Sequence, residues 1–435
     1  MNTISHVLFA GRPSPIWSVA TLLVCLHPLL SHGESLTFND ALALAVTQAP
    51  VLSARASEID AARQAAIPAG ELPDPRLAVG VENLPIEGPD QFSLTRDFMT
   101  MERVGLMQEF PNHSKRKARI DRALAKVTVM EARSQIARQL VLREAAVGWI
   151  ARHSIEQQLA LLDQLSAENE LFAKSVRAAY AGGKGSATDL VMPAQEAAMI
   201  EERRDRLGAR QAREVAALRQ WIGSAAELPL SGDIPELALD QDSLAHRLHQ
   251  HPELVAFDSE SRVLDAQVAE AAADKHPDWA LEFSYQHRGS QFSDMVMLQI
   301  SIDLPLFAES RQNPRIAAEV ARRKALDAER ETSLREHQAM LEGDFAEYER
   351  LRRSATRLND VLIPLAEEKV ALALAAWRGG QGQMTEVLAA RRERIETKLK
   401  AIAVSGTREK LAARLHYSYA QPDDDRIANL QGVQR

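Results

Sequence analysis

Cysteine, aromatic residues and long hydrophobic runs are all scarce in this sequence, and each shortage excludes a class of protein. The single cysteine, Cys25, lies near the start, so the rest of the chain can form neither disulfides nor thiolate metal sites. Aromatic residues make up only 5% of 435 residues, and the net charge of −8 gives no basic surface for nucleic acid. After residue 33 no apolar stretch is long enough for a transmembrane helix. If the mature protein enters a membrane, it must therefore do so as a β-barrel.

Enzyme signatures are missing as well. The sequence has no Ser-His-Asp grouping and no zinc-type spacing. Its glycine-rich run, Gly182-Gly183-Lys184-Gly185, lacks the spacing and the following Ser or Thr of a phosphate-binding loop. We therefore predict that the protein is not an enzyme and uses no cofactor.

Three histidines, His246, His249 and His251, cluster in one short segment. The His-x-x-His spacing on a helix could bind a transition metal. The duplicated copy of this segment, described below, carries Leu44, Thr47 and Ala49 instead. This difference favours a solvated surface over a metal site.

Residues 1–33 have the pattern of an export signal. An apolar run from Ile16 to Leu30 is followed by Ser31-His32-Gly33, which supplies the small residues expected before a cleavage site. A membrane anchor is the alternative, but the run is shorter than the ~20 residues that span a bilayer. The residue before Cys25 is valine, whereas a lipoprotein signal has a small residue there; lipidation of Cys25 is disfavoured but stays open. We predict that the segment is cleaved after export.

Proline and glycine are nearly absent from Ser114 to Tyr180, where the only such residue is Gly148. Apolar residues recur at helical spacing throughout this stretch. A helix of this length would reach roughly 100 Å. It ends at the glycine-rich run 182–185, and a helical pattern resumes from Thr188 to about Ile222. Because no compact domain can bury so long a helix, it must lie in a coiled coil or a wall of parallel helices.

The sequence is internally duplicated, with an offset of about 194 to 204 residues. Gly182-Gly183-Lys184-Gly185 with Thr188-Asp189-Leu190 matches Gly379-Gly380-Gln381-Gly382 with Thr385-Glu386-Val387. Upstream, Gln48-Ala49-Pro50 matches Gln250-His251-Pro252, and Pro73-Asp74 matches Pro277-Asp278. The repeats span 34–233 and 236–420, which indicates one unit duplicated into a pseudo-symmetric protomer.

Each repeat contains the same predicted elements. The first has strands at 76–84 and 98–110, a long helix at 114–180, a tip at 181–187 and a return helix at 188–222. The second has strands at 280–287 and 294–304, a long helix at 315–378, a tip at 379–383 and a return helix at 384–415. Residues 421–435 form a polar tail that we expect to be disordered.

The predicted strands alternate apolar and polar residues, and the clearest runs from Val296 to Leu304. This period marks a membrane-barrel strand, although a half-buried strand of a soluble sheet shows the same alternation. Four strands cannot close a barrel, and an open sheet edge is not tolerated in lipid. If these strands enter a membrane, several protomers must pool them.

With these motifs the chain resembles the TolC family of outer-membrane efflux channels over essentially all of the mature sequence. The motifs are the strand pair before each long helix and the two glycine breaks, Tyr180-x-x-Gly183 and Trp377-x-x-Gly380 with the residues that follow. Two segments resemble the heavy-metal efflux branch, Met107-Gln108-Glu109-Phe110-Pro111 with Lys115-Arg116, and Leu362-Ile363-Pro364-Leu365-Ala366-Glu367-Glu368.

The resemblance implies a mainly helical fold, a homotrimer with a 12-stranded β-barrel in the outer membrane, and a periplasmic α-barrel of 12 coiled-coil helices. It also implies docking onto a periplasmic adaptor (membrane fusion) protein and an inner-membrane pump of the resistance-nodulation-division (RND) class. The family's acidic rings at the entrance are matched here only by Asp189 and Glu386, and the first tip is richer in glycine than expected.

On this interpretation Gly182, Gly183, Gly379 and Gly380 form the periplasmic tips that dock the adaptor. Asp189 and Glu386 lie just past the tips, where a narrowing tunnel would gather carboxylates. Ordinary helix capping is the alternative, because an acid in the first turn of a helix is favoured by the helix dipole.

Five methionines fall on one inferred face of equivalent strands: Met99, Met101, Met107, Met295 and Met297. They share parity with Arg103, Glu109, Gln299 and Asp303, so they should face the lumen. Thioether sulfur is a soft ligand suited to Cu(I), and by the same argument to Ag(I). Gap filling is the more ordinary role of methionine.

The sequence thus predicts the passive exit duct of a tripartite efflux system, exporting heavy-metal cations. The sequence does not distinguish copper and silver from cobalt, zinc and cadmium as the cargo. Export of drugs, organic solutes or proteins through the same fold is the first alternative. A periplasmic adaptor, which also uses long helical hairpins, is the alternative from another class, and a soluble coiled-coil scaffold is the third.

Overall fold

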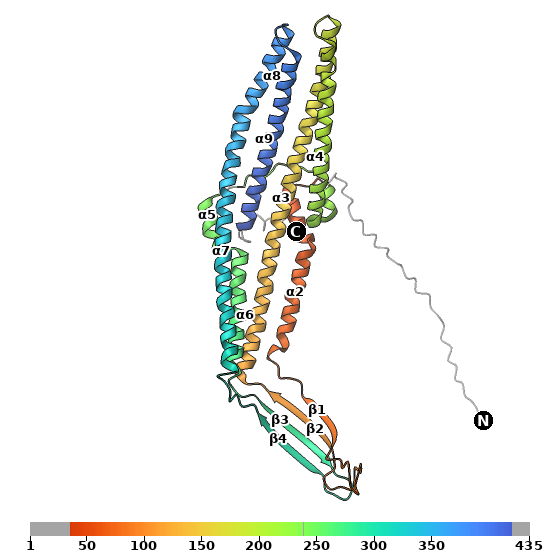
Figure 1. The fold of residues 1–435 in the computed structure, drawn as a ribbon, viewed down its shortest axis with the longest axis vertical. Coiled ribbons are helices and arrows are strands. Elements are labelled where there is room, and N and C mark those ends of the chain that lie inside the picture. The colour runs from red at the N-terminus through yellow and green to blue at the C-terminus, as the bar shows by residue number, and fades with distance from the viewer. Residues whose placement is uncertain (1–34, 238, 420–435) are drawn as a thin grey trace, which may run out of the picture.

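A computed structural model describes residues 35–237 and 239–419 of the chain. The predicted signal at 1–33, with Cys25, and the predicted tail at 421–435 lie outside these residues. The molecule is elongated, with a sheet at one end and the tips of two helical hairpins at the other (Figure 1). The prediction of a mainly helical fold with a small sheet is confirmed.

Both repeats contain two shorter helices, two strands and a long helical hairpin, in that order. The first repeat consists of α1 (Phe38–Gln48), α2 (Pro50–Ala66), η1 (Ile67–Gly70), β1 (Arg76–Glu82), β2 (Met101–Phe110), α3 (His113–Ala181), η2 (Ala187–Leu190), α4 (Met192–Ile222) and η3 (Gly223–Glu227). The second consists of α5 (Gln241–Arg247), η4 (Leu248–Gln250), α6 (Pro252–Ala273), β3 (Trp279–His287), β4 (Met295–Ile302), α7 (Gln312–Arg357), η5 (Leu358–Leu362), α8 (Ile363–Arg378) and α9 (Met384–Tyr419).

The helix α3 is the central element, with 69 residues in one unbroken run. It begins at Asn112, whose side chain accepts a hydrogen bond from the Lys115 backbone N–H at 2.9 Å. It ends at Gly182, the first residue of the glycine break. Along its length it packs against α2, α4, α6 and α9, so both repeats are built around it.

The matching helix of the second repeat runs without a gap from Gln312 to Arg378 but contains one irregular turn. The sequence predicted one helix at 315–378, but α7 and α8 are separated by η5, a single π-helical turn. The cause is Pro364, at the start of α8. Proline has no N–H for the carbonyl four residues earlier, and its ring crowds that carbonyl, so the preceding turn widens.

The sheet is antiparallel with the strand order β1-β2-β3-β4, so β1 and β4 are its edges. The central pair places Leu106 opposite Phe283 and Gly105 opposite Ser284. On the far side of β3, Phe283 lies opposite Leu298. The four-stranded sheet therefore contains strands of both repeats.

The largest apolar core lies halfway along the helices, where α1, α3, α4 and α9 meet. The Trp149 indole is fully buried there, packs edge-on against Phe38 at 5.5 Å between ring centres, and donates to the Leu36 carbonyl at 3.1 Å. Within the described residues no helix has the length and hydrophobicity that crossing a bilayer requires.

Candidate functional site

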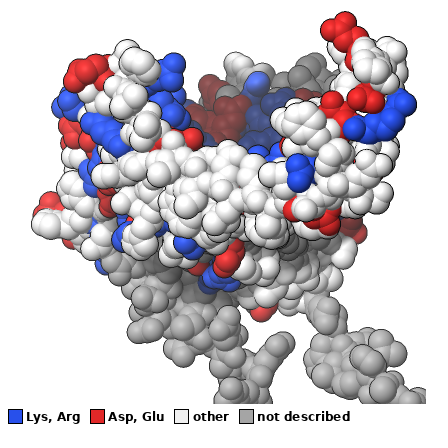
Figure 2. All heavy atoms as spheres, turned by 90° about the horizontal axis from the view of Figure 1, so that it is seen from below, with Lys and Arg blue, Asp and Glu red and all other residues white. Residues whose placement is uncertain are grey.

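The sheet has one apolar face and one polar face. Apolar side chains from all four strands share one face and are exposed: Leu77, Val79, Val81, Val104, Leu106, Phe283, Val296, Leu298, Ile300 and Ile302. Leu298, for example, is 67% exposed. The surface seen from the sheet end is a broad uncharged band, with charged side chains at its rims and in the hollow behind it (Figure 2). So large an apolar surface marks an interaction with lipid or protein.

The opposite face carries paired charges. The Arg103 guanidinium of β2 forms ion pairs with Glu82 of β1 and Glu282 of β3. Ser284 and Gln286 of β3 share this face and are buried. A charge network on one side and exposed aliphatic side chains on the other suit a sheet that separates water from an apolar medium.

The register separates the five methionines. Met107 lies opposite Glu282, Met297 opposite Ser284 and Met295 opposite Gln286, so no two of the five are cross-strand partners. The strand β2 begins at residue 101 rather than 98, which leaves Met99 in the preceding turn.

Asp278, directly before β3, connects the sheet to the helices through its hydrogen bonds and ion pair. Its carboxylate accepts from the Asn112 backbone N–H at 2.7 Å and pairs with the Lys115 ammonium at 2.9 Å. Burial by itself would raise the pKa of Asp278, but the Asn112 N–H and the Lys115 charge outweigh it, and the pKa lies below its usual value. The carboxylate therefore joins the start of α3 to the start of β3.

We predict that Asp278→Asn lowers the thermal midpoint of the purified protein by a few degrees at neutral pH, because the negative charge that strengthens the hydrogen bonds from Asn112 and Lys115 is lost. A depressed folded-state pKa gives stability that is complete above the unfolded pKa of about 4 and is lost as pH falls through the folded value. The difference from the wild type should thus shrink in acid. Asp74→Asn is the control, since Asp74 is the exposed counterpart in the first repeat. Equal midpoints for both variants would contradict the role of Asp278.

The two tips end their long helices with the same hydrogen bonds. In the first, Gly183 N–H donates to Tyr180 and Lys184 N–H donates to Ala179; in the second, Gly380 donates to Trp377 and Gln381 to Ala376. These bonds cap the last carbonyls of each long helix. Gly183 has a φ of +73° and Gly380 a φ of +75°, a conformation that favours glycine. Gly182 and Gly379 keep negative φ and end the helices.

The two hairpins lie side by side at the tips and enclose a cleft of about 750 Å³. Residues of both tips line it, including Lys184, Asp189, Trp377, Arg378 and Met384. Below the cleft an apolar cluster of Phe172, Val176, Met384 and Val387 joins the hairpins. The Arg391 guanidinium stacks over the Phe172 ring at 4.5 Å and pairs with Glu196 at 3.1 Å, which fixes α9 against α3 and α4.

Asp189 and Glu386 both take part in capping. The Asp189 carboxylate accepts from the Ser186 backbone N–H at 2.8 Å, within a capping box. Glu386 lies in the first turn of α9, and its carboxylate accepts a longer bond of 3.4 Å from the Gln383 N–H. Glu386 is exposed and Asp189 is partly exposed, so solvent can reach both side chains.

The histidine cluster divides into two groups. His246 and His249 are exposed, as expected for a solvated surface. That expectation is wrong for His251, which is only 6% exposed and packs beside His337 of α7. His251 precedes Pro252 and caps α6, so it turns inward while its two neighbours remain on the surface. No sequence signal indicated His337, because it lies far along the chain from His251.

Comparison with protein-family models and with curated protein sequences finds no match. Comparison with solved structures finds close likeness in fold. A membrane protein from Pseudomonas aeruginosa has a TM-score of 0.76 at 18% identity, covering 88% of this chain and 90% of that one. MtrE, an outer-membrane channel of Neisseria gonorrhoeae, has a TM-score of 0.70 at 15% identity, covering 88% of both chains. The chain has the fold of TolC-type outer-membrane channels.

CusC, whose structures describe transmembrane channel formation, also has this fold, with a TM-score of 0.69 at 15% identity. The alignment covers 88% of this chain and 91% of CusC. At these identities the likeness concerns the fold, and function has to be argued from the sheet and the tips.

Proposed function

We propose that the protein is the outer-membrane exit duct of a tripartite efflux system and works as a homotrimer. The observation that carries this proposal is the two-faced sheet at one end of the molecule. The edge strands β1 and β4 have no partner within the described chain, and the apolar face is exposed. Unpaired strand edges are not tolerated in lipid, so the sheet needs further copies to close it.

Three chains would pool their strands into one closed sheet in the outer membrane. The exposed aliphatic face would then contact lipid, and the face with Arg103, Glu82 and Glu282 would line a water-filled lumen. The helices would continue this lumen through the periplasm, because α3 alone is roughly 100 Å long.

The tips would dock a periplasmic adaptor, which in turn would join an inner-membrane RND pump. Each tip holds its glycines exposed at the point farthest from the sheet (Figure 1). The cleft between the tips carries both charged and apolar side chains, which suits contact with another protein. Energy for transport would come from the pump.

Glu386 would lie at the entrance, where three copies bring three carboxylates together. Such a ring raises the local cation concentration and loses this effect in high salt. We predict that Glu386→Gln reduces the cation selectivity of single channels in planar bilayers by about twofold or more. Asp189→Asn, which alters the capped counterpart in the first tip, should have a smaller effect. If the cation selectivity of Glu386→Gln is unchanged, Glu386 acts only as a helix cap.

Heavy-metal cations are the proposed cargo, on the resemblance of residues 107–111 and 362–368 to the heavy-metal branch. A deletion strain complemented by the gene should regain tolerance to copper, silver, cobalt, zinc or cadmium.

Replacing the five methionines with leucine distinguishes soft-metal contact from packing. Selective loss of copper and silver tolerance would support contact of single thioethers with these ions, and equal tolerance to all metals would exclude it.

Export of organic solutes or proteins is the second candidate within the same fold, and restored tolerance to drugs but not metals would favour it. A periplasmic adaptor fits less well. Adaptors have one helical hairpin flanked by β-rich domains, whereas this chain has two hairpins and one shared sheet.

A further inference from the structure

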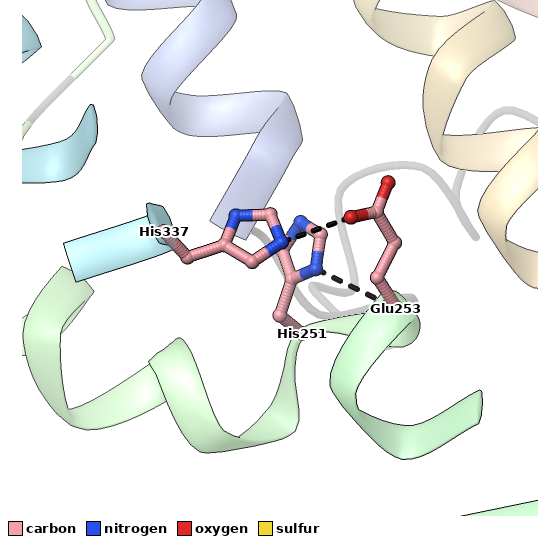
Figure 3. A group of neighbouring side chains, drawn as sticks. All are labelled: His251, Glu253 and His337. Carbon is pink, nitrogen blue, oxygen red and sulfur yellow. Dashed lines mark hydrogen bonds and ion pairs between the residues drawn. The ribbon is translucent and has the colours of Figure 1, made fainter. Parts of the chain in front are cut away.

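Two histidines and a glutamate meet where the start of α6 packs against α7 (Figure 3). His251 caps α6, Glu253 lies in its first turn, and His337 projects from α7. One ligand atom from each residue lies within 4.8 Å of the other two. The His337 Nε2 donates to the Glu253 carboxylate at 2.9 Å, and the two imidazole rings are 4.1 Å apart between centres.

The cluster is closed on one side and open on the other. The side chain of His337 is 11% exposed, whereas that of Glu253 is 49% exposed, so an ion could enter past the carboxylate. Tyr419 of α9 covers the rings, with its centre 5.5 Å from that of His251. Arg143 of α3 is the nearby cation and opposes positive charge at the site.

His251 and Glu253 are in the protonation states that metal ligands need. Burial, and then the proximity of His337, lower the pKa of His251 to about 4, so its imidazole is neutral at neutral pH. The hydrogen bond from His337 lowers the pKa of Glu253, so its carboxylate is charged. Neutral imidazole and carboxylate are the forms that bind a metal.

The duplication shows that the fold does not require this cluster. The counterpart of His251 in the first repeat is Ala49, which likewise precedes a proline and caps a helix, α2. Ala49 is buried in an apolar cluster with Val141 and Leu142 of α3. The cap position of this junction is therefore an apolar alanine in one repeat and an imidazole, beside a second imidazole and a carboxylate, in the other.

We propose that His251, Glu253 and His337 bind one divalent cation of the zinc class, which joins the start of α6 to α7. Two imidazoles and one carboxylate suit Zn(II), Co(II) or Ni(II) rather than Mg(II) or Ca(II). Ligand atoms of a tetrahedral zinc site lie roughly 3.3 Å apart, given bonds of about 2.0 Å. Small rotations would bring the three residues to this spacing, and a water molecule would complete the site.

Metal binding requires little rearrangement. The Nδ1 of His251 accepts only a long bond of 3.3 Å from the Glu253 backbone N–H, so the ring can change tautomer at small cost. The metal would replace the hydrogen bond between His337 and Glu253. Protons compete with the metal for both imidazoles, so affinity should fall in acid.

Cobalt(II) is the probe for this site, because tetrahedral Co(II) has intense ligand-field bands in visible light. The full mature protein in detergent, stripped of metal, should show one such spectrum per chain at neutral pH. His251→Ala, which copies Ala49, and Glu253→Gln should each weaken Co(II) and Zn(II) binding at least 10-fold, since loss even of outer partners costs 10- to 100-fold. His249→Ala is the matched control and should bind as the wild type does.

Zinc should also raise the thermal midpoint of the wild type and of His249→Ala, but not of His251→Ala. The proposal would be overturned if the wild type gave no ligand-field spectrum with Co(II), or if His249→Ala weakened metal binding as much as His251→Ala does. The three residues would then have only a structural role through their hydrogen bonds. If His251→Ala fails to assemble, Glu253→Gln decides, because it keeps the shape of the side chain. The readout is binding and not transport, so its failure would leave the exit-duct proposal untouched.

Discussion

Leu298→Arg should prevent assembly in the outer membrane. Leu298 lies on β4, is 67% exposed and belongs to the aliphatic face proposed to contact lipid. An arginine on the lipid face of a membrane strand costs about 2–4 kcal/mol near the bilayer centre, and a trimer would carry three of them. We expect at least a tenfold loss of assembled protein in outer-membrane fractions, measured by immunoblotting of unheated samples.

Gln299→Arg is the matched control, one residue further along the same strand. Gln299 lies opposite Glu282 on the polar face, so an arginine there would meet a carboxylate and water. It should assemble as the wild type does. Equal assembly of both variants would contradict the assignment of the faces. If only Gln299→Arg failed to assemble, the face with Gln299 would be the one that contacts lipid.

The second large effect is expected at the tips. Gly380→Pro should abolish transport, because proline fixes φ near −65° where Gly380 has +75°, and it removes the N–H that donates to Trp377. Gly183→Val forces a β-branched residue into φ of +73° in the other tip. Strain of about 1–3 kcal/mol at each tip would be relieved by a change of its shape. Export and trimer formation should persist, because the tips are far from the sheet.

Transport is measured as growth of a complemented deletion strain on the exported compound, and docking as crosslinking to the adaptor. We expect at least a tenfold drop in tolerance for both tip variants. Gly208→Val is the control, because Gly208 lies within α4 with open space around it and no positive φ. Tip variants that still transport and still crosslink would place the docking surface elsewhere.

The sequence predicted the long helices and the faces of the strands well, because both follow from local patterns. The near absence of proline and glycine in 114–180 predicts α3, and the alternation around Val296 predicts which residues of β4 share a face. Pro364 can also be read from the sequence. Because proline has no N–H, it explains the π-helical turn before α8.

Contacts between distant segments could not be predicted. Asp278 binds the start of α3 and His251 meets His337 only after the chain has folded, and no periodicity records such pairs. The difference between Ala49 and His251 in the duplicated segment favoured a solvated surface, whereas His251 is buried.

Closure of the sheet by three chains is tested most directly by native mass spectrometry of the particle extracted in detergent from outer membranes. The expected result is a single species with the mass of three mature chains, which exposes no free strand edge. A monomer, or recovery of the protein from the soluble periplasmic fraction, would contradict it.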